Sequence, residues 1–459
     1  MELKRNVYNE LLEWRKKRTG KVLSLEGARQ VGKTYTLKKF ARENFKQVIY
    51  INMAEPSGEI LLSCMEKAEY REPGHPPNDD ILQRTMLMYD ESFLDTLDTV
   101  IIIDEIQESA KVFNTIRTFS REFECCVIVT GSYLGKLLDP SFFLPAGDCD
   151  YMTMTTLDFE EFLDAFGKRE LFNSLDLYGS SPHSEYDEIK KYFDVYMVIG
   201  GYPEIVTTYL ETGSIEECEK KLWALVRVFM DESKRYFDTI TDVNIFDRIY
   251  QAMTTLMLTE KRGSPDLVTE LSKLAYPETS GVLTKGQINH ALGWLNSSHI
   301  IGYADKCIDC NPKEIKTNNR IYFMDLGITY IYLKQAFATE AETKGLLAET
   351  FVFRIMQKHI KNDIAGAAPW FATWKNTGEL DFYVLSHKDR CAYGIEVKST
   401  NSSAKTAQSI FKAGKLNFLY YLKGDSYGGM AEDGRILTVP LFLASRISFD
   451  KKQTLQTDL

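Results

Sequence analysis

Short apolar runs alternate with helix-like amphipathic stretches over the first third of the chain. The runs are VLSLEG, QVIYIN, TVIIID, CCVIVTGS and YMTMTTL, all between Val22 and Leu157. Strands of a parallel sheet are near-continuous apolar runs because helices cover both faces of the sheet. We therefore expect an α/β domain over residues 1–155, in which helices connect the strands of a parallel sheet.

Apolar residues at helical spacing dominate residues 156–260, as in DFEEFLDAF and CEKKLWALVRVFMDESKRYF. We expect a helical lid or linker domain there. Residues 261–340 combine helix-like runs with two apparent strands around a turn, HIIGYADKC and RIYFMD, an order that is typical of a winged helix. Winged helices contact DNA or pack between domains, and the sequence leaves both roles open.

The pattern changes again near Lys344, where a long helix, KGLLAETFVFRIMQKHI, begins. The runs PWFATWK, ELDFYVLS and CAYGIEVKS then read as strands, followed by a helix after Ser402, another helix near Phe418 and a last strand, RILTVPLFL. This order predicts a separate α/β domain over residues 341–459, which is close to the usual domain size.

Composition narrows the class of protein. With 44% hydrophobic and 26% charged residues, the 459-residue chain is an ordinary globular protein and most of it is not disordered. Neither a membrane-spanning run nor the apolar stretch of a signal peptide is present, so we expect a cytoplasmic protein without membrane contact. The net charge of −10 disfavours coating of nucleic acid along the whole surface, but residues 341–459 hold 16 basic and 12 acidic residues, so a polyanionic partner is expected there.

A phosphate-binding loop is the first candidate site. Residues 27–34 read GARQVGKT, which fits G-x-x-x-x-G-K-[ST] and lies between a strand-like run and a helix-like run. Two glycines let the backbone curl so that its N–H groups face phosphate oxygens, while the lysine reaches the β- and γ-phosphates and the threonine ligates Mg²⁺. We expect ATP to contact all eight loop residues: Gly27, Ala28, Arg29, Gln30, Val31, Gly32, Lys33 and Thr34.

Two carboxylates end the apolar run VIIIDE at residues 100–105, as in a Walker B segment. Asp104 would hold Mg²⁺ through water, and Glu105 would orient or deprotonate the attacking water. Ser132, after the next strand-like run, is placed to touch the γ-phosphate or this water. The alternatives are a strand end with two solvated acids and, for Ser132, a helix N-cap.

The second candidate site has the residue order of a PD-(D/E)xK nuclease centre. Glu349 lies on a helix, Asp381 on a strand, and Glu396 and Lys398 form E-x-K on the next strand. Residues two apart on a strand share a face, so Glu396 and Lys398 project together. Asp381 and Glu396 would bind Mg²⁺ with Glu349 completing the shell, and Lys398 would position or activate a water. A solvated strand face, or a nuclease fold that only binds, is the alternative.

Taken together, these motifs resemble the predicted bacterial and archaeal AAA+-type ATPases whose C-terminal half carries a winged-helix segment and a restriction-endonuclease-like domain. The resemblance also rests on VTGS, on GGYPE at Gly200 to Glu204, on RIYFMDLG at Arg320 to Gly327, and on GLLAET, GELDF and GIEVKS. It implies a prokaryotic P-loop NTPase with an AAA+-like parallel sheet that binds and hydrolyses ATP, and it leaves homo-oligomer formation open.

One departure from that family concerns hydrolysis. Its members typically carry a Gly-Arg pair shortly after the VTGS strand, in a position where an arginine could contact phosphate, and here the pair is Gly147-Asp148. Either Arg29, Arg117 or Arg121 takes this role or hydrolysis is slow, and Asp148→Arg is expected to raise turnover.

Two hypotheses for the function follow. The first is an AAA+-type ATPase that uses ATP and Mg²⁺ and is coupled to a nuclease-like C-terminal domain acting on DNA. The second is an ATP-switched DNA- or protein-binding module whose nuclease fold is catalytically inactive. A metal-dependent cleavage assay separates them.

Overall fold

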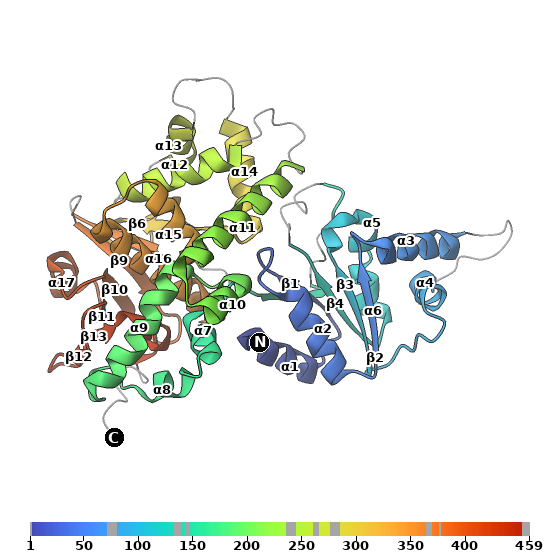
Figure 1. Ribbon diagram of the computed structural model, residues 1–459, viewed down its shortest axis with the longest axis horizontal. Coiled ribbons are helices and arrows are strands. Elements are labelled where there is room, and N and C mark those ends of the chain that lie inside the picture. The colour runs from blue at the N-terminus through green and yellow to red at the C-terminus, as the bar shows by residue number, and fades with distance from the viewer. Residues whose placement is uncertain are drawn as a thin grey trace. The chain divides into compact units, whose positions relative to one another are not determined.

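A computed structural model describes residues 2–70, 80–132, 140–143, 145, 147–235, 245–259, 266–275, 285–363, 370–375 and 378–451. The chain forms two compact units (Figure 1). The N-terminal unit contains residues 2–156 and 293–299, and the C-terminal unit contains residues 157–292 and 300–459. No helix in the described ranges is long and apolar enough to cross a membrane.

The N-terminal unit is a five-stranded parallel sheet with the order β2-β3-β4-β1-β5. Its strands are β1 (Val22–Glu26), β2 (Gln47–Asn52), β3 (Thr99–Asp104), β4 (Cys126–Thr130) and β5 (Cys149–Thr153). Its helices are α1 (Asn6–Lys17), α2 (Lys33–Asn44), α3 (Pro56–Glu69), α4 (Ile81–Tyr89), η1 (Ile106–Glu108), α5 (Ala110–Phe113) and α6 (Ile116–Glu122). Each of the five apolar runs in the sequence is one strand, so the predicted α/β fold is confirmed for this unit.

The inner strands of this sheet contain few polar residues because they are buried. Every residue of β3 is buried, and helices lie on both faces of the sheet (Figure 1). The sheet continues directly into the phosphate loop, where Gly27 has φ +147°. A Cβ atom at Gly27 would lie 2.0 Å from the Met154 carbonyl oxygen, so the close approach of the chain after β1 and after β5 requires glycine.

The C-terminal unit is built on an eight-stranded sheet with the order β12-β13-β11-β10-β9-β8-β6-β7. Its strands are β6 (Ile301–Cys307), β7 (Ile315–Phe323), β8 (Trp370–Trp374), β9 (Gly378–Leu385), β10 (Ala392–Lys398), β11 (Phe418–Lys423), β12 (Gly429–Met430) and β13 (Ile436–Pro440). The helices that precede the sheet are α7 (Phe159–Ala165), α8 (Arg169–Ser174), α9 (His183–Ile199), α10 (Pro203–Thr212), α11 (Ile215–Arg235), α12 (Ile245–Thr259), α13 (Leu267–Ala275) and α14 (Lys285–Ser297), the last of which ends in residues grouped with the N-terminal unit. The other helices are η3 (Ile308–Cys310), α15 (Leu326–Gln335), α16 (Glu340–Asp363), α17 (Lys405–Lys412) and η4 (Leu441–Arg446).

One predicted helix is wrong. The segment near Phe418 forms the strand β11, which pairs in parallel with both β10 and β13. Five of its six residues are buried, since β10 and β13 flank its two edges and α17 and η4 also pack against it. A short apolar run of this kind is compatible with either a buried strand or a buried helix, and the pairing partners decide between them.

The two strands expected in the winged-helix segment are present as the antiparallel pair β6 and β7. β6 also pairs in parallel with β8, so this hairpin is part of the sheet that holds the predicted nuclease-like strands. Cys307 on β6 packs in one hydrophobic cluster with residues of β8 to β11. The division into domains at residues 156–260, 261–340 and 341–459 therefore remains a proposal, since the structure groups these segments in one compact unit.

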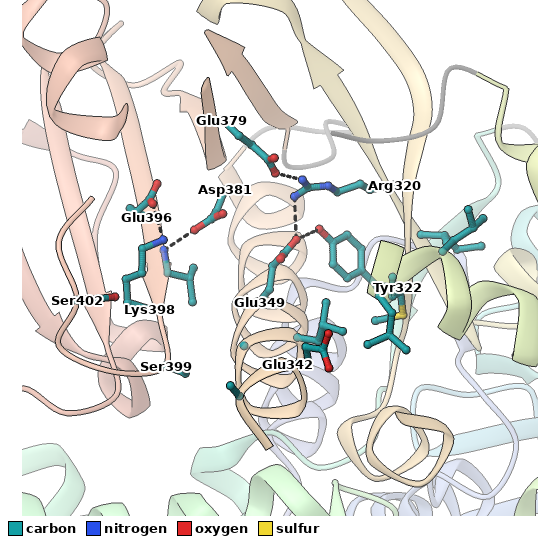
Figure 2. A pocket seen from close by; sticks show the side chains of 18 of the residues that line it. Arg320, Tyr322, Glu342, Glu349, Glu379, Asp381, Glu396, Lys398, Ser399 and Ser402 are labelled. Atoms are coloured by element: carbon teal, nitrogen blue, oxygen red, sulfur yellow. Dashed lines mark hydrogen bonds and ion pairs between the residues drawn. The ribbon is translucent and has the colours of Figure 1, made fainter. Parts of the chain in front are cut away.

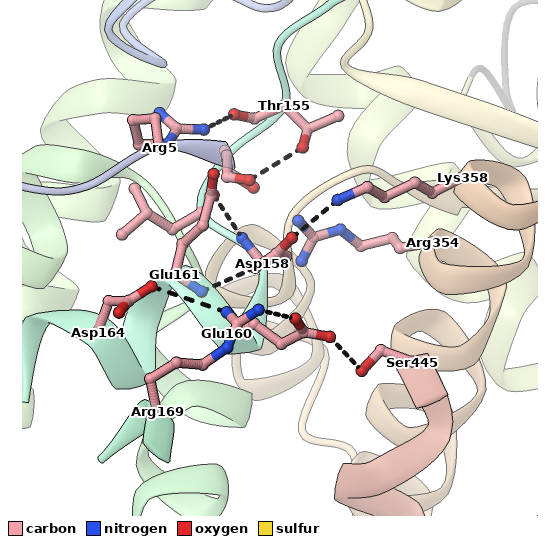
Figure 3. A network of polar contacts seen from close by, with 12 residues as sticks. Arg5, Thr155, Asp158, Glu160, Glu161, Asp164, Arg169, Arg354, Lys358 and Ser445 are labelled. Atoms are coloured by element: carbon pink, nitrogen blue, oxygen red, sulfur yellow. Dashed lines mark hydrogen bonds and ion pairs between the residues drawn. The ribbon is translucent and has the colours of Figure 1, made fainter. Parts of the chain in front are cut away.

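Polar contacts connect the first helices of the C-terminal unit to its last ones (Figure 3). Lys358 on α16 donates a hydrogen bond to the Asp158 carboxylate, the N-cap of α7, at 3.0 Å. Ser445 on η4 donates to Glu160 on α7 at 2.7 Å, and Glu160 also forms an ion pair with Arg169. The Lys358–Asp158 and Ser445–Glu160 contacts join residues 200 and 285 positions apart.

Asp325 links two of the sequence motifs quoted above. Its carboxylate is 2% exposed and accepts hydrogen bonds from the backbone N–H groups of Gly201, Gly327 and Ile328, at 3.0, 2.8 and 3.2 Å. A Cβ atom at Gly200 would lie 2.3 Å from this carboxylate. GGYPE and RIYFMDLG therefore hold α9, α10 and α15 together, and this structural role accounts for both patterns.

Candidate functional site

The phosphate loop lies between the carboxyl end of β1 and the first turn of α2, the position that the sequence predicts. Gly32, the N-cap of α2, has φ +98°, and Gln30 has φ +62°. These left-handed conformations turn the loop tightly before the helix begins. The helix N-terminus adds unpaired backbone N–H groups and its positive dipole end, which favour an anionic ligand.

Lys33 is buried inside this loop, with 5% of its surface exposed. Its ammonium donates hydrogen bonds to the carbonyl oxygens of Gly27 and Ala28 at 2.7 and 2.8 Å. Burial lowers the pKa of Lys33 to about 8, against the opposing effect of Glu105 and Asp104. A buried ammonium in a ring of backbone groups is prepared to pair with phosphate oxygens.

Thr34 and Asp104, the two residues expected to share Mg²⁺, lie together. The Thr34 hydroxyl donates to Asp104 Oδ2 at 2.7 Å, and the backbone N–H of Glu105 donates to Asp104 Oδ1 at 2.9 Å. The Tyr50 hydroxyl also donates to Asp104 Oδ2, at 2.8 Å, a contact that sequence reasoning missed. The hydroxyl and carboxylate oxygens fit Mg²⁺, which prefers oxygen ligands.

Glu105 is held in a left-handed conformation, φ +51°, directly after β3. Its carboxylate accepts hydrogen bonds from Ser132 at 3.2 Å and from Gln107 at 2.6 Å. Gln107 is 1% exposed and follows Asp104 and Glu105 in VIIIDEIQ, so its position in the motif was the only signal for it. Thr130, at the end of β4, donates a hydrogen bond to the Leu25 carbonyl oxygen on β1, and this contact gives it a structural role.

Arg5 is a further residue that sequence reasoning missed. Its guanidinium donates to the carbonyl oxygens of Val31, inside the phosphate loop, and of Thr155, each at 2.5 Å (Figure 3). The segment before α1 thus fixes the loop from outside. Nothing in the local sequence indicates this contact, because Val31 and Thr155 are 26 and 150 residues away from Arg5.

Asp148 lies away from the phosphate loop of its own chain. Asp148 precedes β5, and its carbonyl oxygen accepts a hydrogen bond from Val22 at the start of β1, so it lies at the amino edge of the sheet. At ~3.3 Å per residue, the five-residue strand β1 separates this edge from the phosphate loop by roughly 15 Å. Arg121 pairs with Asp148 at 3.0 Å and Arg117 lies 4.0 Å from it, so both arginines share this remote position. Arg29 remains near Lys33, whose pKa it helps to lower.

The predicted nuclease-like residues line one cleft of about 690 Å³ in the C-terminal unit. Asp381 and Glu396 lie on the antiparallel strands β9 and β10, Lys398 lies two residues further along β10, and Glu349 faces them from α16 (Figure 2). Glu396 and Lys398 therefore lie on the same face of β10, as the strand spacing predicts. Lys398 donates to Glu396 Oε1 at 2.6 Å, and the Val397 N–H donates to Asp381 at 2.7 Å.

Three residues of this cleft were missed. Arg320 on β7 donates to Glu349 Oε1 at 2.8 Å and forms an ion pair with Glu379 through its other terminal nitrogen (Figure 2). The Tyr322 hydroxyl donates to Glu349 Oε1 at 2.5 Å. Glu379 stands two residues before Asp381 on β9, so strand periodicity could have found it, whereas Arg320 and Tyr322 are brought in by the β6–β8 pairing.

Burial and mutual repulsion raise the pKa values of the buried acids in this cleft. Burial, then Glu396 and Glu349, raise the pKa of Asp381, and burial raises the pKa of Glu396 against the effect of Lys398. Glu396 Oε2 is buried and has no hydrogen-bond partner among the described residues. A divalent cation at Asp381 and Glu396 would satisfy this oxygen, so these two residues fit a metal. In the described part of the chain, however, no three His, Cys, Asp or Glu side chains are gathered closely enough to hold one ion.

Comparison with known proteins identifies the N-terminal unit. The sequence of residues 19–163 matches the protein family described as "AAA domain". These residues form an AAA-family P-loop ATPase domain. No curated protein matches the chain.

Several solved structures are similar to the chain. A Walker-type ATPase of Pyrococcus abyssi is 15% identical with a TM-score of 0.47, over 72% of this chain and 96% of that one. The ORC2 protein of Aeropyrum pernix is 11% identical with a TM-score of 0.34, over 74% and 96%. The RuvB Holliday junction branch migration motor of Thermotoga maritima is 11% identical with a TM-score of 0.30, over 73% and 96%. The assignment of the AAA domain rests on the match of residues 19–163.

Proposed function

We propose that the chain binds and hydrolyses ATP with Mg²⁺ in its AAA domain and carries a PD-(D/E)xK nuclease-like centre that acts on DNA. The observation that carries the first part is the contact between Thr34 and Asp104 beside the buried Lys33, because it joins the two motifs of a P-loop ATPase into one site. The raised pKa values of Asp381 and Glu396 in the C-terminal cleft support the second part.

For ATP, each described residue has a specific task. The loop N–H groups and the Lys33 ammonium would bind the β- and γ-phosphates, and Thr34 and Asp104 would hold Mg²⁺, which neutralises charge on the phosphates. Glu105, oriented by Gln107 and Ser132, would position a water in line with the γ-phosphate and take its proton. Arg5 would keep the loop in the binding conformation through Val31.

For DNA, the strand face of the cleft would do the chemistry. Asp381 and Glu396 would hold the metal, which polarises a phosphodiester and lowers the pKa of a bound water. Burial lowers the pKa of Lys398, but Asp381 and Glu396 raise it by more, so the net shift is upward. Lys398 is therefore charged and suited to orient this water or to stabilise the phosphate. Homo-oligomer formation belongs to the same proposal, because an arginine from a neighbouring copy could complete the ATP site.

The binding-module hypothesis has a specific observation in its favour. Glu349, the third expected ligand, is engaged by Arg320 and Tyr322, and Lys398 pairs with Glu396. A centre whose acids are neutralised by the chain's own side chains could bind DNA or protein without cleaving it. In that case ATP would switch binding, and the nuclease fold would be catalytically inactive.

Paired variants of the full chain test both parts. Lys33→Ala should abolish ATP binding because it removes the charge opposite the phosphates, and Glu105→Gln should bind ATP but turn it over at least about a hundredfold more slowly. Lys46→Ala, whose side chain is 84% exposed, is the matched lysine control. Wild-type turnover in Lys33→Ala would disprove the ATPase assignment.

Asp381→Asn decides between the nuclease and the binding module. In a cleavage assay with Mn²⁺ and single- or double-stranded DNA, the wild type should cut and Asp381→Asn should not, while ATP hydrolysis continues in both. DNA binding without metal-dependent cleavage by the wild type would favour the inactive fold.

A further inference from the structure

The acids of the C-terminal cleft are divided into two groups with different partners. On the strand side, Asp381 accepts a backbone N–H and Glu396 retains a buried oxygen without a hydrogen-bond partner in the described residues. Glu349 on α16 and Glu379 on β9 share a different cation, Arg320. Each pair of acids therefore has one positively charged partner, Lys398 for the first pair and Arg320 for the second, and neither pair is fully neutralised.

Arg320 is built into this position. It lies on β7, is 8% exposed, and its guanidinium carbon lies 4.3 Å from the centre of the Phe371 ring on β8. One terminal nitrogen contacts Glu349 and the other contacts Glu379. A buried guanidinium with two carboxylate partners and an aromatic face is fixed in place, unlike a solvated surface arginine.

The Arg320 contact occupies one of the two carboxylate oxygens that Glu349 could offer to a metal. Glu349 Oε1 accepts both the Arg320 hydrogen bond at 2.8 Å and the Tyr322 hydrogen bond at 2.5 Å. A divalent ion held by Asp381 and Glu396 can gain Glu349 only if one of these donors gives up its place or the other carboxylate oxygen turns toward the ion. Two cations of this kind in one cleft also repel each other.

We propose that Arg320 is a built-in counter-cation that competes with a divalent metal for Glu349 and Glu379, so that metal binding is weakened while Arg320 pairs with these two acids. This proposal rests on the metal centre proposed above and concerns its regulation. Arg320 lies on β7, so a movement of the β6–β7 hairpin that shifts Arg320 would change metal affinity. Arg320 is in this sense a regulatory residue of the centre, distinct from its ligands.

The direction in which metal affinity changes on removal of Arg320 shows whether Arg320 competes with the metal or positions Glu349 for it. If Arg320 only arranged Glu349 for the metal, its removal would weaken metal binding. If it competes with the metal, its removal leaves two acids without a cation, and metal binding becomes tighter because the ion then neutralises them. Arg320→Lys keeps the charge and should bind metal like the wild type.

The experiment is a calorimetric titration of the nucleotide-free full chain with Mn²⁺, for the wild type and for Arg320→Gln, Arg320→Lys and Asp381→Asn. We expect Arg320→Gln to bind Mn²⁺ at least about tenfold more tightly than the wild type, and Asp381→Asn to lose binding. Equal or weaker binding by a folded Arg320→Gln protein would overturn the proposal and leave the metal centre standing. No binding by either the wild type or Arg320→Gln would instead refute the metal centre itself.

A second variant covers the case in which Arg320→Gln does not fold. Tyr322→Phe removes one hydrogen bond to Glu349 Oε1 and no charge, so it should fold and should tighten Mn²⁺ binding by about threefold. Thermal unfolding without metal checks that each variant is folded. Unchanged or weaker Mn²⁺ binding by Tyr322→Phe would then count against competition at this oxygen.

Discussion

The Lys33 ammonium lies among backbone carbonyls and two carboxylates, and burial lowers its pKa from the ordinary 10.5 to about 8. Phosphate oxygens would favour the charged form and raise this pKa again. Nucleotide binding near pH 8.5 should therefore take up a fraction of a proton, whereas binding at pH 6.5, where Lys33 is already charged, should not. Calorimetry of ADP binding in buffers with different ionisation enthalpies measures this uptake.

The lowered pKa of Lys33 also affects the stability of the nucleotide-free protein. Because the pKa of Lys33 is lower in the folded state than in the unfolded state, the folded state binds fewer protons between about pH 8 and 10.5. This group therefore costs stability at neutral pH, and the cost falls as the pH rises through that range.

In the calorimetry of ADP binding, the absence of proton uptake at pH 8.5 would mean that Lys33 does not meet the phosphates.

Asp148 shows the limit of reasoning from a motif at the residue scale. Gly147-Asp148 stands where the proteins that the sequence resembles carry a Gly-Arg pair, but the strand direction decides at which edge of the sheet it lies. β5 begins at Cys149 and runs parallel to β1, so Asp148 is at the edge opposite the phosphate loop. An arginine introduced there would meet Arg117 and Arg121, which now pair with Asp148, and we no longer expect it to accelerate hydrolysis in its own chain.

At the scale of elements, Asp325 connects helices that the sequence leaves as separate segments. Asp325→Ala should lower the free energy of unfolding of the C-terminal unit by about 3 kcal/mol or more, because three backbone N–H groups lose their buried acceptor. Asp325→Asn keeps one acceptor oxygen and should cost less. Urea unfolding followed by circular dichroism measures both.

The control for Asp325 is Asp433→Ala. Asp433 forms an ion pair with Arg435 in an exposed turn, where water screens the charges and loss of the pair should change stability little. A loss of the same size at both positions would show that Asp325 is not the connection between GGYPE and RIYFMDLG.

Periodicity also explains what could be predicted about strands and what could not. The faces of Glu396 and Lys398 follow from the two-residue repeat of a strand, and the structure has them on one side of β10. β11 was mistaken for a helix because FLYYL is a continuous apolar run without alternation, and its pairing with β10 and β13 is not encoded in a local pattern. Long-range pairing of this kind depends on residues far away in the chain.

At the scale of the whole molecule, the two units have separate cores, so calorimetric unfolding should show two transitions. ADP should raise the temperature of one transition only, and Lys33→Ala should remove that shift. The other transition should depend on pH. Because the pKa values of Asp381 and Glu396 are raised, the folded state binds more protons than the unfolded state, and stability should fall as the pH rises from about 4.

Divalent metal should reverse this second dependence. Mn²⁺ would bind the ionised acids in the folded state and should reduce the loss of stability at higher pH. A transition that is insensitive to both pH and Mn²⁺, or a single transition that shifts with ADP as a whole, would contradict this account of the two units.

The sequence by itself determined the parallel sheet of the AAA domain, its phosphate loop, the pairing of Thr34 with Asp104 as a hypothesis, and the shared face of Glu396 and Lys398. These follow from local rules: apolar runs, glycine positions and the two-residue repeat of strands. Tertiary structure alone decided that Arg5 fixes the loop through Val31, that Asp148 lies at the remote edge, and that Arg320 reaches Glu349 and Glu379. Each of these depends on which strands become neighbours, and strand order in a sheet is set by burial over the whole chain.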